Sequence, residues 1–545
     1  MKSRGPARAP FLFRPHRPAR YNRLVPLRGV PAAACGVAVL AAWGAARHPA
    51  AVPLVWLALT LACLAVPVAE RRFLATGWLL AGLAVLAVGW VVALDHELAL
   101  RHTLLFVAAA LTFGLARRAP PDECALGVLV VLLAATAVVA FIQVGGGLDA
   151  ARGAVADLPL AVRERAELRL ASGRAFGTAS LPGHFAALLL LACPLLVDRA
   201  ARAAGARRLG WWLVAALAGA GIVLTRSAAG WAVAAVLVFA VLARGTPTRW
   251  RWLGGCALAA AGVAVLALRP DLEHLEPIAL RWVNWQTAGW VALHHPWLGV
   301  GLGGVGQAAL LAPTAAGNST PYAHNSVLQL IAEFGLAGAP LVAAALWALA
   351  RLLRAGWSTE RALVLAVAVL PLHNLVDFSL YAPEVLLPWA VLAGTLAGRL
   401  AAPASRPTPA WLLVPLLIGG LVATTLGWRG GAEAEKARLL PRAERAAAAA
   451  AAAAWTPWTV TPLTVAAGEA LAGRPSATEA TALDDALAGR WWVQPRSAGW
   501  AEARARLLVA ADRRGEALVW AREARRRAPW RGELATLEAV CDATR

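Results

Sequence analysis

The sequence predicts an all-α protein that crosses a membrane many times and ends in a soluble helical segment. Three observations predict this class. The chain of 545 residues is 59% hydrophobic and only 15% charged, whereas soluble domains carry about 25% charged residues. Its apolar residues form blocks of about 17–25, the length that a helix needs to cross a hydrocarbon core of about 30 Å. Arginine clusters separate these blocks, and beyond residue 428 the composition becomes charged and helix-forming.

The first 29 residues are strongly basic and contain seven arginines. They lead into an apolar block that is soon followed by a second one, without the short apolar stretch and cleavage site of a secretory signal peptide. We therefore expect residues 1–29 to form a cytoplasmic tail and residues 30–428 to form a polytopic membrane domain.

Within the membrane domain we expect about 12–13 transmembrane helices, since its apolar blocks have the length of a membrane span. The candidate spans are Val30–Ala46, Ala51–Ala69, Phe73–Leu94, Ala99–Ala116, Cys124–Val144, Leu181–Val197, Trp211–Leu224, Ala228–Ala243, Trp252–Leu268, His324–Ala350, Leu363–Leu380, Val385–Ala397 and Trp411–Trp428.

The charges between the spans predict which connectors face the cytoplasm. Every second connector carries arginine pairs or clusters, for example residues 70–72, 117–118, 198–208 and 351–361, and the connectors between them are poorer in arginine. Basic connectors stay on the cytoplasmic side. We therefore expect the segments 145–180 and 269–323 to lie outside, the second as a large loop.

Residues 429–545 are expected to form a soluble helical domain on the outer side, because an odd number of spans precedes them. The run of nine alanines at 446–454 has very high helix propensity. Farther on, residues 500–529 read as two helices joined near Gly515 and ended by Pro529, which is similar to a degenerate tetratricopeptide repeat. A bundle of short helices is the alternative interpretation.

Three arginines at the expected outer ends of spans are candidates for function, because charged residues at membrane depth are costly. They are Arg174, Arg226 and Arg281. Arg226 is the most informative, since residues 225–227 are nearly the whole connector between two spans. The alternative is an arginine that only marks a helix end while its charge reaches water.

His324 is the candidate proton acceptor. Helical spacing places it at the outer mouth of a span, with Asn325 at the start of the helix. A neutral imidazole there can take a proton from an acceptor hydroxyl group. The alternative is an interfacial histidine without a chemical role.

Composition and spacing argue against several other classes. The net charge of +21 lies in short connectors rather than on one face, so we expect no nucleic-acid partner. No H-E-x-x-H or other metal-ligand spacing is present, and we expect no metal and no cofactor. Residues 301–306 match G-x-G-x-x-G, but no strand or βαβ unit surrounds them, so a flexible turn is the interpretation.

Six polar fragments resemble, in order and sidedness, the O-antigen ligase and polymerase family. They are Arg174 with Gly177 to His184, Thr225-Arg226-Ser227, Arg281 to Gly303 with His295-Pro-x-x-Gly-x-Gly, His324-Asn325, Glu333-x-Gly335-x-x-Gly338, and His373-Asn374 with Asp377. The resemblance covers about residues 173–398. One departure is His184, near which the family often has asparagine.

The resemblance implies a glycosyltransferase of the bacterial inner membrane that works at the periplasmic face without a cofactor. Its donor would be a glycan on a carrier of the undecaprenyl-pyrophosphate type, and its acceptor a lipid A core, a growing polysaccharide or a protein hydroxyl. The implied catalytic residues are Arg226, Arg281 and His324. The implied substrate-binding residues are Arg174, His295, Asn325 and Glu333.

Two other classes stay open. A transporter or flippase for the same lipid-linked sugars would also use an arginine-lined cavity, but no repeat between the two halves of the chain indicates it. A membrane scaffold would explain the C-terminal helices, which offer a surface for a protein partner, but it leaves the polar fragments without a role.

Overall fold

A computed structural model describes residues 30–45, 50–66, 76–155, 160–242, 276–316, 320–400, 408–440 and 442–542. This part of the chain contains helices and no strand, which confirms the predicted all-α class. The expected tail 1–29, the expected span Trp252–Leu268 and most of the arginine-rich connectors 70–72, 244–251 and 399–406 lie outside the described residues.

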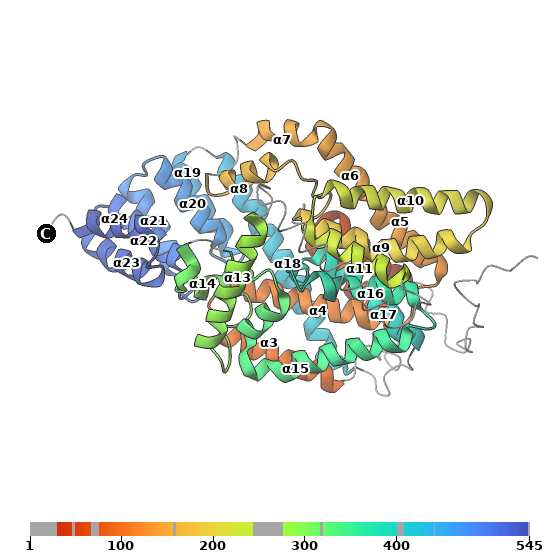
Figure 1. Cartoon of the computed structure of the whole chain (residues 1–545). Helices are drawn as coiled ribbons and strands as arrows, with labels where there is room; N and C mark the ends of the chain where they lie inside the picture. Colours follow the sequence, from red (N-terminus) through yellow and green to blue (C-terminus); the bar gives the residue numbers. More distant parts are fainter. Residues whose placement is uncertain are drawn as a thin grey trace, which may run out of the picture.

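The helices form a membrane bundle, a set of connecting elements and a C-terminal group (Figure 1). The bundle contains α1 (Val30–Leu40), α2 (Ala51–Ala65), α3 (Thr76–Val91), α4 (His96–Arg118), α5 (Glu123–Ala135), α6 (Ala137–Ile142), α9 (Pro182–Arg202), α10 (Gly205–Leu224), α11 (Ala228–Leu242), α15 (Ser326–Gly356), α16 (Arg361–His373), α17 (Pro383–Leu400) and α18 (Ala410–Leu439). The connecting elements are α7 (Leu148–Val155), α8 (Leu160–Ala171), α13 (Glu276–His294) and α14 (Val305–Ala309). The C-terminal group contains α19 (Arg442–Ala454), α20 (Thr461–Ala472), α21 (Ala477–Ala488), α22 (Ala498–Ala510), α23 (Arg514–Arg527) and α24 (Gly532–Asp542).

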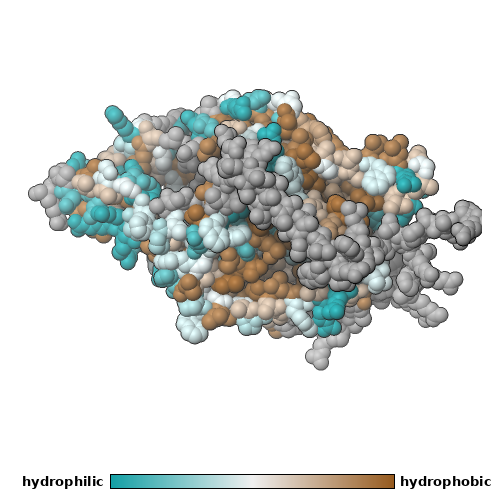
Figure 2. Space-filling model, in the orientation of Figure 1, coloured by the Kyte–Doolittle hydropathy of each residue, from teal (hydrophilic) through white to brown (hydrophobic). Residues whose placement is uncertain are grey.

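The bundle has the apolar helices of a multi-pass membrane protein. Six helical stretches are long and apolar enough to cross a membrane, and shorter apolar helices accompany them. The six are His96–Arg118, Glu123–Gly153, Pro182–Arg202, Gly205–Leu224, Ser326–Gly356 and Ala410–Ala437. Where described residues are visible over the membrane bundle, many of them are hydrophobic, and hydrophilic residues gather at the C-terminal end (Figure 2). A bilayer is the solvent that suits such a surface.

Small residues allow the central helices of the bundle to approach closely. A Cβ atom added to Gly394 of α17 would lie 2.4 Å from the carbonyl oxygen of Phe113 in α4, and one added to Gly398 would lie 2.4 Å from that of Arg117. Such contacts are the usual way in which membrane helices pack, since lipid supplies little hydrophobic drive between them.

The expected span Leu363–Leu380 is shorter in the structure. Helix α16 ends at His373, and residues 374–382 form a loop with one short 3₁₀ turn. Asn374 makes this break, because its side chain donates to the Leu370 carbonyl oxygen and accepts from the Leu380 amide. Its carbonyl oxygen also accepts from the Ser326 amide at the start of α15. These bonds satisfy backbone groups that a broken helix would otherwise leave unpaired.

Helix α15 contains a second break, at Gly335, whose φ of +56° and ψ of −157° lie outside the helical region. The amides of Leu336 and Ala337, freed by this break, donate to the carbonyl oxygens of Pro296 and Trp297 at 2.8 and 2.9 Å. A Cβ added at Gly335 would lie 2.6 Å from the Gly299 amide nitrogen. A Cβ added at Gly303 would lie 2.6 Å from Leu98 Cβ, and one added at Gly301 would overlap the backbone of Ala93. Residues 301–306, for which the sequence predicted a flexible turn, are therefore tightly packed.

The C-terminal helices dock on the first turn of α4. The His96 amide donates to the Val493 carbonyl oxygen at 2.8 Å. The Glu97 carboxylate accepts from the Thr461 hydroxyl at 2.8 Å, and Gln494 donates to Asp95 at 2.9 Å. The boundary expected at residue 429 lies inside α18, whose helix continues through charged residues to Leu439.

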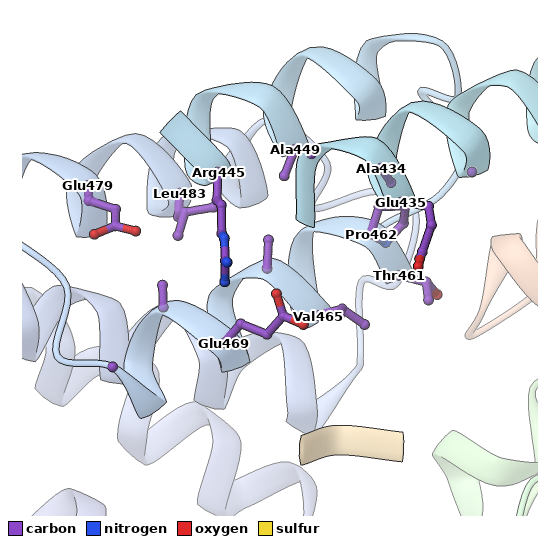
Figure 3. A pocket seen from close by; sticks show the side chains of 15 residues that line it. Ala434, Glu435, Arg445, Ala449, Thr461, Pro462, Val465, Glu469, Glu479 and Leu483 are labelled. Atoms are coloured by element: carbon purple, nitrogen blue, oxygen red, sulfur yellow. The ribbon is translucent and has the colours of Figure 1, made fainter. Parts of the chain in front are cut away.

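The C-terminal group has its own apolar core, which includes Leu463, Leu483, Leu487 and Trp500. A cavity of about 310 Å³ lies between the end of α18 and α19–α21. Figure 3 shows Arg445 projecting into this cavity toward Glu469. This segment is therefore a group of packed helices with a core of its own. Its assignment as a tetratricopeptide repeat stays a prediction.

Candidate functional site

Two of the three residues predicted to be catalytic have an unusual backbone. Arg226 and His324 have φ angles of 48° and 52°. This left-handed region is uncommon for residues other than glycine, and such strain often occurs at functional sites. Among the described non-glycine residues with positive φ, the other two are Arg474 and Asp512 in the C-terminal group. In the membrane bundle, the strain falls on the two residues that the sequence singled out.

The turn between α10 and α11 presents Arg226. The Thr225 hydroxyl donates to the Ile222 carbonyl oxygen at 2.7 Å and accepts from the Ser227 amide at 3.1 Å. Thr225 and Ser227 are buried, whereas Arg226 between them is exposed. Arg174 donates from Nε to the Thr225 carbonyl oxygen at 3.0 Å. The turn thus holds the side chain of Arg174 in place and leaves Arg226 exposed.

His324 precedes α15 and is held from both sides. Its carbonyl oxygen accepts from Trp285 Nε1 of α13 at 3.2 Å. Its ring packs edge-on against Phe378, with 4.7 Å between the ring centroids. Asn325 caps α15 as predicted, because its Oδ1 accepts from the Val327 and Leu328 amides, and its Nδ2 donates to the Leu375 carbonyl oxygen. The imidazole is thus oriented, and its side chain stays 25% exposed.

Asp377 connects the two histidines of this site. Its Oδ1 lies 3.8 Å from Nδ1 of His324, and its Oδ2 lies 3.8 Å from Nε2 of His373. The start of α9 meets the same carboxylate, since a Cβ added to Gly183 would lie 2.5 Å from Asp377 Oδ2 and 3.8 Å from Ser227 Oγ. The loop after α16, the start of α9 and the turn at Arg226 therefore meet at one point.

The charges of this cluster act on one another. Burial lowers the pKa of the Arg174 guanidinium, Arg281 and Arg226 lower it further, and Asp377 opposes them. Burial also lowers the pKa of His324 to about 4, with Asp377 acting in the opposite direction and Arg281 in the same one. His324 is therefore neutral at pH 7, as a proton acceptor must be.

Asp377 is ionised in the same surroundings. Burial alone would raise its pKa, but the nearby histidines and Arg281 outweigh this effect and lower the pKa below its ordinary value. Three arginines and one carboxylate leave the site with an excess of positive charge, which suits an anionic ligand.

Two of the predicted substrate-binding residues, Glu333 and His295, lie outside this cluster of arginines and histidines. Glu333 is completely buried. It accepts from Gln329 at 2.7 Å, from the Gly303 amide at 2.9 Å and from the Tyr381 hydroxyl at 2.8 Å. Both of its oxygens are thus occupied in holding the glycine turn against the loop after α16. Burial lowers the pKa of His295, and the charge of Arg496 in the C-terminal group lowers it further. The structure brings together Arg174, Arg226, Arg281 and His324, and it leaves His295 and Glu333 outside this cluster.

A second buried network was missed by sequence reasoning. The Ser180 hydroxyl lies 2.8 Å from His184 Nδ1 and donates to Glu384 Oε1 at 2.7 Å. The His184 ring packs edge-on against Phe378, the same ring that His324 contacts, with 4.8 Å between centroids. Glu384 is an acidic residue beside an expected span, and the cost of a charge at that depth is the signal that would have singled it out.

Comparison with known proteins finds a family match for the part of the chain that contains most of this cluster. A family model described as O-antigen ligase matches residues 213–343, a range that contains Arg226, Arg281 and His324. No curated protein and no solved structure matches the chain. Arg174 and Asp377 lie outside the matched range, but they contact or approach residues inside it. Residues 213–343 therefore match the O-antigen ligase family, as the polar fragments predicted, and this match supports a role in glycan transfer.

Proposed function

We propose that this protein transfers a glycan from a polyprenyl-pyrophosphate carrier of the undecaprenyl type to an acceptor hydroxyl at the periplasmic face of the bacterial inner membrane. The observation that carries the proposal is the meeting of three arginines with a neutral histidine in one cluster. The acceptor belongs to one of three classes: a lipid A core, a growing polysaccharide or a protein hydroxyl.

The arginines suit the leaving group of this reaction. A pyrophosphate anion leaves when the glycan is transferred, and a guanidinium binds phosphate oxygens through two parallel hydrogen bonds and never loses its charge. Arg226 would reach the pyrophosphate from its strained turn, with Arg174 and Arg281 beside it. Donors fixed before the reaction stabilise the charge that develops on the leaving oxygen.

His324 suits the other half of the reaction. Asp377 lies on the Nδ1 side of its ring, which favours the proton on Nδ1 and leaves Nε2 free to accept. The acceptor oxygen then bonds to the anomeric carbon while the bond from that carbon to the pyrophosphate oxygen breaks. The hydroxyl proton passes to Nε2, and Asp377 stabilises the imidazolium that results.

A complementation experiment tests the proposal. The gene is deleted and restored as wild type, His324→Ala, Arg226→Ala or the control Arg207→Gln, at equal protein abundance in the membrane. Arg207 is an exposed residue in the first turn of α10. We expect His324→Ala and Arg226→Ala to lose the mature surface glycan and to accumulate lipid-linked precursor on the outer leaflet. The control Arg207→Gln should behave as wild type. Precursor retained on the cytoplasmic leaflet would instead identify a transporter.

A further inference from the structure

The strained backbone at His324 is held on both sides of the residue. Its φ of 52° lies in the left-handed region, which costs free energy for a residue that has a Cβ. Such a conformation persists only where the surrounding structure fixes the chain. Asn325 fixes the chain after His324, because it caps α15. The chain before His324, residues 321–323, is held by Gln329 of the same helix.

Gln329 reaches back from the beginning of α15 to the segment that precedes the helix. Side chains in a helix point toward its N-terminus, so a long amide on the fourth residue can pass the helix start. Its Oε1 accepts from the Ala323 amide at 2.6 Å, and its Nε2 donates to the Pro321 carbonyl oxygen at 3.3 Å. One side chain therefore binds the backbone on both sides of Tyr322.

Glu333 determines which way the amide of Gln329 points. Its Oε1 accepts from Gln329 Nε2 at 2.7 Å and also from the Gly303 amide at 2.9 Å. Because this oxygen is an acceptor, Gln329 must present its nitrogen to it, and the amide oxygen is left to face the Ala323 amide. Gln329 and Glu333 are both completely buried. Neither side chain can therefore replace these partners with water.

The Tyr322 ring connects the same segment to the site. It stacks on the Phe378 ring, with 4.2 Å between the centroids and an angle of 8° between the planes. Its hydroxyl lies 3.2 Å from Nε2 of His102 in α4. Phe378 is the ring against which His324 packs edge-on. A shift of residues 321–323 would thus move both the backbone of His324 and the ring beside its imidazole.

We propose that Gln329 is a positioning residue that holds residues 321–323 and thereby keeps the imidazole of His324 in place. Glu333 orients Gln329 and acts through it. Neither residue contacts a substrate, so Glu333 has a supporting role in place of the substrate contact that the resemblance implied. This inference rests on the proposed function, since His324 is the proton acceptor of that reaction.

Transfer kinetics of the full chain in nanodiscs test the proposal. Gln329→Met keeps the length of the side chain and loses its hydrogen bonds. We expect kcat to fall about 10²-fold, as for a catalytic group displaced by about 1 Å, and the KM for the lipid-linked donor to stay unchanged. Gln329→Asn keeps the amide but is one methylene too short, and it should lose as much. Trp389→Phe is the control, since it removes one bond between α17 and α16, to the Val367 carbonyl oxygen. It should keep the kcat of wild type.

The acid limb of kcat/KM separates a positioning role from a purely stabilising one. Burial lowers the pKa of His324 to about 4, Asp377 opposes this, and Arg281 and His184 add to it. An imidazole released from its place meets more water, so its pKa rises toward the ordinary value of 6.5. The acid limb should therefore move to higher pH in Gln329→Met and stay near pH 4 in the control. An unchanged kcat, or a lower kcat with an unmoved acid limb, overturns the proposal.

Chemical labelling of His324 provides a readout besides activity. Diethyl pyrocarbonate modifies the neutral imidazole, and the His324 side chain is 25% exposed. The labelling rate against pH, measured by mass spectrometry, therefore reports the pKa of His324. We expect this pKa to rise in Gln329→Met and Gln329→Asn, and equal values in these variants and wild type overturn the proposal. Failure of the proposed function is recognised separately, from a His324→Ala variant that transfers glycan at the wild-type rate.

Discussion

Two histidines, His184 and His324, pack against the ring of Phe378, and they differ in burial, backbone conformation and hydrogen bonding. His184 is 3% exposed at its side chain, lies inside a regular helix, and shares the Ser180 hydroxyl with a buried carboxylate. His324 is 25% exposed, has a strained backbone, and lies 3.8 Å from its carboxylate without a hydrogen bond. The hydrogen-bonded and buried ring of His184 stabilises the fold. The ring of His324 is oriented by its neighbours but has no hydrogen bond from them, so it is available to a substrate.

The largest expected effect separates these two residues by activity. His324→Ala should lower the rate of glycan transfer by about 10³-fold, since general base catalysis contributes about 10²–10⁴-fold. Its thermal unfolding in nanodiscs should stay close to that of wild type, because the ring makes few contacts. The transfer rate is measured at saturating donor. A His184→Ala variant with an equal loss of activity and normal stability would show that the comparison assigns the wrong histidine.

A smaller effect is expected at Arg226. Arg226→Ala should lower the transfer rate by about 10²-fold, the loss seen when one donor to a developing oxyanion is removed. Arg226→Lys should recover only part of the rate, because lysine keeps the charge but loses the paired hydrogen bonds. Arg226→Gly serves as the control for backbone strain, since glycine adopts a φ of 48° without cost. A fully active Arg226→Gly would mean that the turn, and not the guanidinium, is required.

The pH dependence of the transfer reaction tests whether His324, beside Asp377, is the base. Because the pKa of His324 is lowered to about 4, kcat/KM should stay high as the pH falls through 6.5 and should decline only near pH 4. Asp377 opposes this lowering. Asp377→Asn should therefore move the acid limb to still lower pH and reduce the rate at pH 7 by about tenfold, an effect of about 1.4 kcal/mol. A decline centred near pH 6.5 in wild type would show that His324 is not the base.

The sequence was sufficient for the parts of the molecule that depend on local pattern. Each expected span within the described residues contains a helix, although the helix of Leu363–Leu380 ends early, at His373. A run of apolar residues of membrane length has few alternatives to a helix. Arg226, Arg281 and His324 were predicted as site residues because polar residues at the ends of spans are costly and because their order resembles a family. The structure brings them close together, and their roles stay a prediction. Asn325 was placed at a helix start, and it caps α15.

The sequence was insufficient where the answer depends on contacts between distant segments. Asp377 was placed in the second half of an expected span, because the apolar pattern continues past His373 and does not show that Asn374 ends the helix. The resemblance assigned Glu333 to substrate binding. Its three hydrogen-bond partners, Gln329, Gly303 and Tyr381, could not be foreseen, because no local pattern relates them. The docking of the C-terminal helices at Glu97 likewise joins residues more than 300 positions apart in the chain.

The smallest expected effect on activity concerns the carboxylate beside His184. Glu384→Gln should change the transfer rate by less than about threefold, yet it should lower the free energy of unfolding by about 1–3 kcal/mol, the cost of a disrupted buried hydrogen bond. Asp377→Asn is the matched variant, because both exchange a buried carboxylate for an amide within the reach of a histidine. Thermal unfolding and transfer rates of the two variants are compared in the same nanodiscs. If Glu384→Gln loses activity and keeps its stability, the Ser180, His184 and Glu384 network belongs to the reaction, and the two histidines share one function rather than dividing structure from chemistry.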